Sequence, residues 1–204
     1  FFQLFINEAI DLDQFVKCFN ENAPLDLKVL SSKNTEAPFN IIQSSKLKEY
    51  HYYFSSGSKN HPFAASLLVG FQENLDIELM IEGAKLFEGI HYFHKYCTDP
   101  TKETVFKREI ISCVIEENDI LTANFFPETS YVLKVRGMGF LRYQIRLMMG
   151  VLVDLGKHKI SLDFIINSLK EGNDRKFLRT IAPGSGLQLF DIKFDCIAYS
   201  GHAM

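Results

Sequence analysis

Apolar residues recur at helical spacing in four parts of the chain. This spacing predicts helices over residues 11–20, 76–87, 140–155 and 162–170. The segment 140–155 has the longest apolar stripe, and it ends at Gly156 and Lys157, residue types that are typical of a helix C-terminus. We therefore expect this segment to be the principal helix of the fold.

Shorter apolar runs, of which residues 130–136 alternate most cleanly, predict strands. They cover residues 1–6, 27–30, 48–55, 107–116, 130–136 and 187–194. Strands and helices do not alternate regularly, which favours an α+β fold: a mostly antiparallel, mixed sheet with helices packed on it. We expect Tyr50, residues 131–136 and residues 187–194 to share that sheet, with the helix 140–155 packed against it. We also expect one domain of catalytic type over residues 1–204.

The composition narrows the class of protein. Of the 204 residues, 47% are hydrophobic and 23% are charged, which is too apolar for a disordered chain. No apolar run approaches the roughly 18 to 20 residues that span a bilayer, so no membrane partner is expected. A net charge of −3 excludes a wholly basic nucleic-acid coat, and any nucleic-acid site must therefore be a local patch.

The cysteines point to a reducing compartment. Cys18, Cys97, Cys113 and Cys196 include no C-x-x-C pair, so the sequence suggests neither a zinc site nor a disulfide framework. Free thiols are typical of the cytoplasm, which is where we expect the protein to act.

A basic segment is the candidate patch. Residues 131–150 contain Lys134, Arg136, Arg142 and Arg146 but no acid. Arg142 and Arg146 are four positions apart and share one helix face. The segment is either a solvated basic face or a site for phosphate or carboxylate groups, and the lack of neighbouring acids favours the second interpretation.

The same region carries a family resemblance. The stretch G-F-L-R-Y-Q-I-R-L-M-M-G-V-L-V-D-L-G-K, residues 139–157, resembles the G-F-x-x-x-M-V-R-x-M-V-G-x-L-x-x-V-G segment of the tRNA pseudouridine synthase A family. Four further segments resemble that family in its own order, and they are residues 22–29, 48–52, 86–93 and 182–189. Two positions depart from the pattern: Tyr92 stands where Asp is usual, and Arg142 where His is common.

The resemblance implies an activity, namely the isomerisation of uridine to pseudouridine in tRNA, with the anticodon stem-loop as the expected target and no metal or cofactor. It gives Arg146 the role of pairing with the catalytic Asp, and Tyr50 that of packing on the flipped base. It assigns further substrate contacts to Leu187, Leu189, Phe140 and His91. It assigns RNA phosphate contacts to Lys134, Arg136, Arg142 and Arg179. It also implies tRNA as the partner and a homodimer as the assembly.

Several of these residues also have a purely structural interpretation. Without the resemblance, Tyr50 in its aromatic-rich strand would be assigned to the core, whereas the resemblance favours stacking. Leu187 and Leu189 are strand core by default. His91 is as compatible with capping or core packing as with an RNA contact.

The family's R-T-D-x-G-V-H motif, which carries its catalytic Asp, is not in these 204 residues. We therefore expect a chain that lacks the N-terminal part with the nucleophile and is inactive alone, while the parent protein is active. Replacement by an internal acid is disfavoured, because Asp11, Asp13, Asp26 and Asp154 are not in an R-T-D context. The alternatives are a non-catalytic RNA-binding module of the same fold and, less favoured, an unrelated α+β binding domain with a basic helix.

Overall fold

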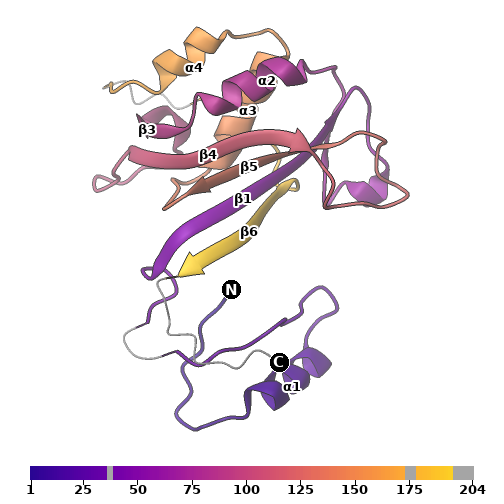
Figure 1. Cartoon of the computed structure of the whole chain (residues 1–204), viewed down its shortest axis with the longest axis vertical. Coiled ribbons are helices and arrows are strands. Elements are labelled where there is room, and N and C mark those ends of the chain that lie inside the picture. The colour runs from indigo at the N-terminus through magenta and orange to yellow at the C-terminus, as the bar shows by residue number, and fades with distance from the viewer. Residues whose placement is uncertain (36–38, 173–177, 195–204) are drawn as a thin grey trace. The chain divides into compact units, whose positions relative to one another are not determined.

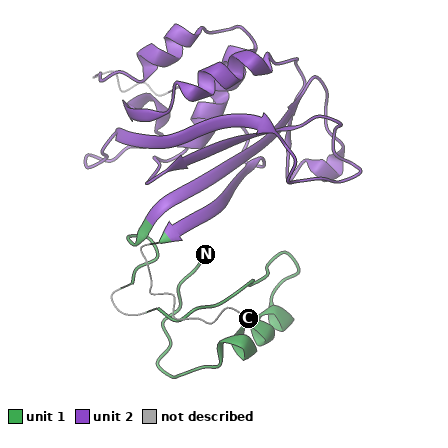
Figure 2. Cartoon of the chain, in the orientation of Figure 1, with its two compact units in different colours: residues 1–45, 194–204 green, residues 46–193 purple. Residues whose placement is uncertain are grey.

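The computed structural model describes residues 1–35, 39–172 and 178–194, which divide between two compact units. Unit 1 is made of two chain segments, residues 1–45 and a second segment that starts at Phe194. Unit 2 contains residues 46–193 (Figure 2). The single domain expected from the sequence stays a prediction.

Among its described residues, unit 1 contains one helix, α1 (Leu12–Asn22). Asp11 caps it by accepting hydrogen bonds from the backbone N–H groups of Asp13 and Gln14 at 2.9 and 3.0 Å, which fixes the start of the predicted helix. The strands predicted at residues 1–6 and 27–30 are wrong. At Val29 the reason is local: the Asn20 side chain bonds both the N–H and the C=O of Val29, so these groups form no ladder.

Unit 2 is built on a sheet of six strands. The order is β2 (Val69–Phe71), β1 (Ser45–Ser56), β5 (Tyr131–Gly137), β4 (Lys107–Glu117) and β3 (Gly89–Tyr92), with β6 (Leu187–Phe194) also paired to β1. The pairs β1–β5, β5–β4 and β4–β3 are antiparallel, and β1–β2 is parallel. The α+β fold and the shared sheet of β1, β5 and β6 are confirmed. Two strands, β2 and β3, were not predicted because they are too short to show a period.

The helices α2 (Ile77–Lys85), α3 (Gln144–Gly156) and α4 (Leu162–Ser168) lie on one side of this sheet (Figure 1). Two short 3₁₀ turns, at Pro62–Ala64 and His94–Tyr96, complete the unit. All three helices were predicted, but α3 begins four residues later than expected. Tyr143 has φ +63°, a left-handed conformation that cannot continue a right-handed helix. None of the described helices is long and apolar enough to cross a bilayer.

The sheet has two different faces, because successive side chains of a strand point to opposite sides. Tyr50, Tyr52 and Phe54 of β1 are paired with Val135, Leu133 and Tyr131 of β5. Together they form the face that packs against the helices, which we call the helix face. Glu49, His51 and Tyr53 are paired with Arg136, Lys134 and Val132. They form the other side, which we call the opposite face.

A glycine brings a distant loop onto α3. A side chain at Gly150 would collide with the carbonyl oxygen of Thr180, so only glycine permits this approach. The contact continues where Ala182 donates its backbone N–H to the carbonyl of Arg146 at 3.0 Å. Residues 180–184 therefore lie beside the basic end of α3.

Candidate active site

Arg146 occupies the first turn of α3, and its side chain is half-buried. Its Nε donates to the carbonyl oxygen of Ala182 at 2.6 Å, and its guanidinium lies 4.8 Å from the ring centroid of Tyr143. Among the described residues, no carboxylate lies within 4.0 Å of it. A partly buried guanidinium without an acid favours the approach of an anion.

Tyr52 connects this arginine to the sheet. Its hydroxyl donates to the carbonyl oxygen of Pro183 at 2.7 Å, next to the residue that accepts from Arg146. Burial raises the pKa of Tyr52, and the positive charge of Arg146 opposes that rise. The phenol therefore stays protonated and holds the Ala182–Pro183 backbone between β1 and α3.

Tyr50 lies on the same face of β1, two residues before Tyr52, and about 7 Å from it along the strand. Its side chain is half-buried, and burial raises its pKa. Phe140 meets it edge to face, with ring centroids 5.2 Å apart and an interplanar angle of 89°. The structure thus brings Tyr50, Phe140 and Arg146 to one region of the helix face.

Leu187 and Leu189 reach this region from β6. The N–H of Tyr53 donates to the carbonyl of Gly186 at 2.9 Å, and β6 then runs beside β1 in the opposite direction (Figure 1). Phe190 stacks on His51 on the opposite face, so its neighbour Leu189 points to the helix face. Leu187 packs against the core, whereas Leu189 is exposed.

Comparison with known proteins identifies the family of this chain. The sequence model of the tRNA pseudouridine synthase family matches residues 84–195, more than half of the chain. The chain belongs to this family.

Named relatives agree with that membership. The chain is 31% identical to tRNA pseudouridine synthase A of Onion yellows phytoplasma (strain OY-M), over 86% of this chain and 67% of the relative. It is 27% identical to tRNA pseudouridine synthase A of Geobacillus sp. (strain WCH70), over 92% of this chain and 71% of the relative. A protein from Desulfotalea psychrophila, tRNA pseudouridine synthase A 2, is 29% identical over the same shares. The resemblance drawn from the motifs is confirmed, and the roles of single residues stay predictions.

Within this family member, the basic segment does not form one patch. Lys134 and Arg136 lie on the opposite face, where Lys134 pairs with Glu116 and the Nε of Arg136 lies 3.3 Å from Glu49. The acids that the segment lacks in sequence thus come from β1 and β4. Phosphate contacts were expected for these two cations because the segment contains no acid. Since each cation has an acid beside it in the fold, that reason no longer applies, and the contacts stay predictions.

The other two predicted phosphate contacts are more accessible. Arg142 is 63% exposed and lies 3.6 Å from the similarly exposed Asp99, a solvated pair of little strength. Arg179 is exposed and has no hydrogen bond or ion pair with another described residue. Both are available to a polyanion.

His91 lies apart from Tyr50. It is in β3, three strand spacings from β1, which is about 14 Å across the sheet. Its Nε2 lies 2.7 Å from the carbonyl oxygen of Glu88, a contact within its own turn. The structure therefore sets His91 apart from Tyr50, and the RNA contact expected of it stays a prediction.

Sequence reasoning gave no role to two residues near the site. Lys48 is half-buried, two positions before Tyr50 on the helix face, and forms no hydrogen bond or ion pair with another described residue. Tyr143 contacts Arg146 with its ring. The signal for Lys48 was present in the period of the strand, but nothing in the pattern indicated the left-handed conformation of Tyr143.

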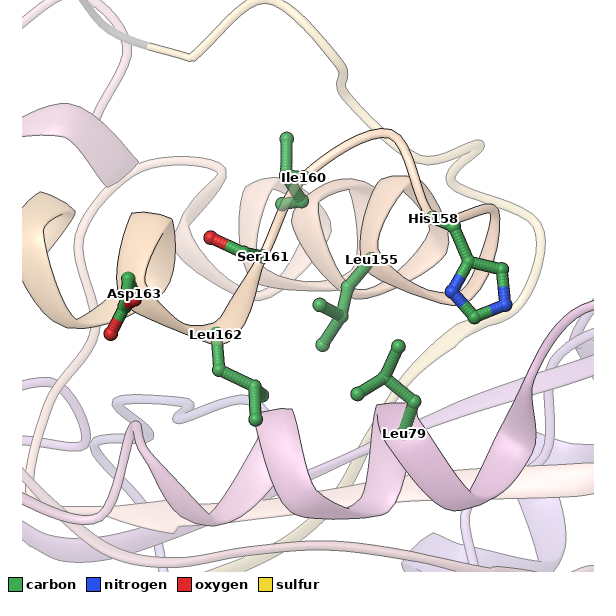
Figure 3. A pocket seen from close by; sticks show the side chains of 7 residues that line it. All are labelled: Leu79, Leu155, His158, Ile160, Ser161, Leu162 and Asp163. Carbon is green, nitrogen blue, oxygen red and sulfur yellow. The ribbon is translucent and has the colours of Figure 1, made fainter.

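The hollows on the surface of the helical layer do not coincide with these residues. One of 510 Å³ lies where α2 faces the end of α3 and the start of α4, lined mainly by Leu79, Leu155, His158 and Leu162 (Figure 3). In the described part of the chain no group of three or more His, Cys, Asp or Glu residues could hold a metal ion. Cys18, Cys97 and Cys113 are free, and Cys196 lies outside the described residues.

Proposed function

We propose that this chain provides the uridine-binding side of a tRNA pseudouridine synthase. The observation that carries the proposal is the Arg146 guanidinium, held beside the Ala182–Pro183 backbone with no carboxylate partner among the described residues. A catalytic Asp that entered there would find a fixed, bidentate donor.

The reaction assigns a task to each group. The carboxylate attacks or deprotonates the ribose, the bond between C1′ and N1 breaks, and the uracil turns so that C5 joins C1′. N1 gains a proton, and C5 loses its hydrogen to water. Tyr50 would stack on the uracil as it turns, with Leu189 as an apolar wall.

The phosphate contacts would come from accessible cations near the site. Arg142 and Arg179 are exposed, and Lys48 lies beside Tyr50. These contacts position the RNA, while stacking in the site selects a flipped base.

The experiment follows tritium released to water from tRNA labelled at C5 of uridine. It compares the 204-residue chain with a version extended by an upstream R-T-D segment. We expect release only from the extended version, because positioning without the reacting carboxylate leaves turnover near background. Release by the short chain would assign the acid to its own residues, and single changes of Asp11, Asp13, Asp26 and Asp154 would identify it. RNA binding without release by either version would instead establish a non-catalytic RNA-binding module.

A homodimer belongs to the same proposal. Large apolar side chains are exposed in unit 1, including Phe1, Phe5, Leu25 and Leu30. Exposed apolar groups of this size favour association with another chain. Light scattering that shows a monomer at every concentration tested would contradict this assembly.

The cytoplasm is the compartment that suits this activity. Its substrate class is tRNA, and the free thiols at Cys18, Cys97 and Cys113 are compatible with reducing conditions. Fractionation that places the protein in an oxidising compartment would contradict it.

A further inference from the structure

Tyr143 breaks two local rules at the start of α3. Its φ of +63° and ψ of 7° are left-handed, a conformation that costs energy for any residue with a β-carbon except in special contexts. It is also the N-cap residue, yet its side chain caps no backbone N–H, and the ring is 39% exposed. Strain of this kind persists where the surrounding structure imposes it, often at functional sites.

The Tyr143 ring has two cations near it. The Arg146 guanidinium lies 4.8 Å from the ring centroid and that of Arg142 lies 5.8 Å away, both within the roughly 6 Å typical of cation–π contacts. The N-terminal end of a helix is itself positive, and no acid occupies the first turn of α3. Two cations are therefore kept at an end that disfavours them, and the ring is an attractive partner for both.

Two contacts hold the Arg146 guanidinium: it lies 4.8 Å from the ring centroid of Tyr143, and its Nε donates to the carbonyl oxygen of Ala182. A β-carbon placed on Gly184 would lie 3.6 Å from Nη1 of Arg146. Of the side chain's donors, this leaves the terminal nitrogens for a further acceptor.

We infer that Tyr143 is a positioning residue, whose ring holds the Arg146 guanidinium so that its terminal nitrogens receive the catalytic carboxylate. The inference rests on the proposed function, which supplies that carboxylate. The ring does this work and the hydroxyl does not, because both cation contacts are made to the ring. The left-handed backbone of Tyr143 sets the direction of a ring whose centroid lies 4.8 Å from one guanidinium and 5.8 Å from the other.

The left-handed backbone of Tyr143 allows a test that distinguishes the positioning of Arg146 from an effect on the stability of the fold. Tyr143→Gly removes the ring but tolerates φ +63°, so the melting temperature is expected to be equal or higher. In the tritium-releasing version, kcat is expected to fall by about 10- to 100-fold with little change in KM for tRNA, because misplacing a reacting group has this cost. Tyr143→Phe keeps the ring and should retain kcat.

Tyr92→Leu is the matched control. It removes a ring that Lys107 approaches at 5.8 Å, in β3 and away from Arg146. Unchanged kcat in this control, together with the loss in Tyr143→Gly, supports the inference. Equal kcat in Tyr143→Gly and the parent overturns it, and so does a fall in Tyr143→Phe as deep as in Tyr143→Gly.

A second readout needs no turnover. The ¹⁵N–¹H signal of Arg146 Nε should carry a ring-current shift in the parent and in Tyr143→Phe, and should lose it and become more mobile in Tyr143→Gly. An Arg146 signal that is the same in all three proteins overturns the inference even where tritium is released. If neither the 204-residue chain nor the extended version releases tritium, the proposed function is rejected instead. The Arg146 signal then decides on its own whether the ring holds the guanidinium.

Discussion

The two faces of the sheet in unit 2 treat cations from one stretch of sequence in opposite ways. On the opposite face Lys134 and Arg136 meet Glu116 and Glu49, and the second oxygen of Glu49 lies 2.8 Å from Nε2 of the buried His51. On the side of the helices, Arg146 contacts the ring of Tyr143 and the carbonyl of Ala182 but no described carboxylate. Lys134, Arg136 and Arg146 all come from the same acid-free stretch of sequence, residues 131–150. The difference teaches that the neighbouring strands, and not the segment itself, decide which cations remain available for a ligand.

The largest effect on activity is expected at Arg146, the cation without a described carboxylate partner. Arg146→Lys keeps the charge but removes the planar fork and the Nε donor to Ala182. In the tritium-releasing version we expect kcat/KM to fall by about 10²- to 10³-fold, as when one preorganised donor is lost. Arg108→Lys is the matched control, because it makes the same chemical change at an arginine of β4 that has no assigned role. Equal kinetics in the two variants would show that Arg146 has no special part in the reaction.

A smaller effect is expected at Tyr50. Tyr50→Ala removes the ring that would stack on the uracil, and affinity for tRNA in the Michaelis complex should fall roughly 10- to 100-fold, since stacking contributes about 1–3 kcal/mol per base. Tyr50→Phe keeps the ring and should retain most of the activity. Steady-state kinetics of both variants provide the measurement, with circular dichroism to verify folding. If the Phe variant were as weak as the Ala variant, the hydroxyl and not the ring face would carry the role.

Phosphate contacts are expected to have a still smaller effect, and they compare the two faces directly. Arg142→Glu should weaken tRNA binding and lower the salt slope by about one, because one phosphate contact is lost. Lys134→Glu should weaken binding less, since Glu116 already neutralises that cation. Lys17→Glu, on α1 of unit 1, should have the least effect. Fluorescence anisotropy at several salt concentrations measures all three, and equal losses would show that the exposed arginines are not the RNA-binding surface.

These contrasts also show how far the sequence could predict the molecule. Periodicity predicted β1, β4, β5, β6 and the four α-helices of the described residues, because each carries apolar residues along one face. It failed at residues 27–30, where the side chain of Asn20, rather than a neighbouring strand, bonds Val29.

For the site, the motifs singled out Tyr50 and Arg146, and their surroundings show why the rest stayed hidden. The pairing of Arg136 with Glu49 depends on the register of β1 against β5, which no local pattern contains. The left-handed Tyr143 depends on the turn that enters α3. The partners of these site residues therefore depend on contacts between segments that are distant in the sequence, which local patterns do not predict.

The smallest expected effect concerns Tyr52, which connects the helix face to the Ala182–Pro183 backbone. Burial raises its pKa in the folded protein, whereas the unfolded chain keeps the ordinary value of about 10. Its contribution to stability is therefore complete below pH 10 and is lost as the pH rises above that value, because the unfolded state then releases the proton more readily.

Tyr52→Phe removes both this titration and the hydrogen bond to Pro183, which contributes about 1 kcal/mol. At pH 7 the variant should be less stable by about that amount. At pH 10.5 the difference should shrink by roughly 0.8 kcal/mol, because ionisation of Tyr52 in the unfolded chain then destabilises the parent but cannot occur in the variant. Urea denaturation at the two pH values measures both free energies of unfolding. A difference that stays constant with pH would mean that the Tyr52 phenol has the same pKa in the folded and unfolded chains. Burial of Tyr52 beside Arg146 would then not make the free energy of unfolding depend on pH.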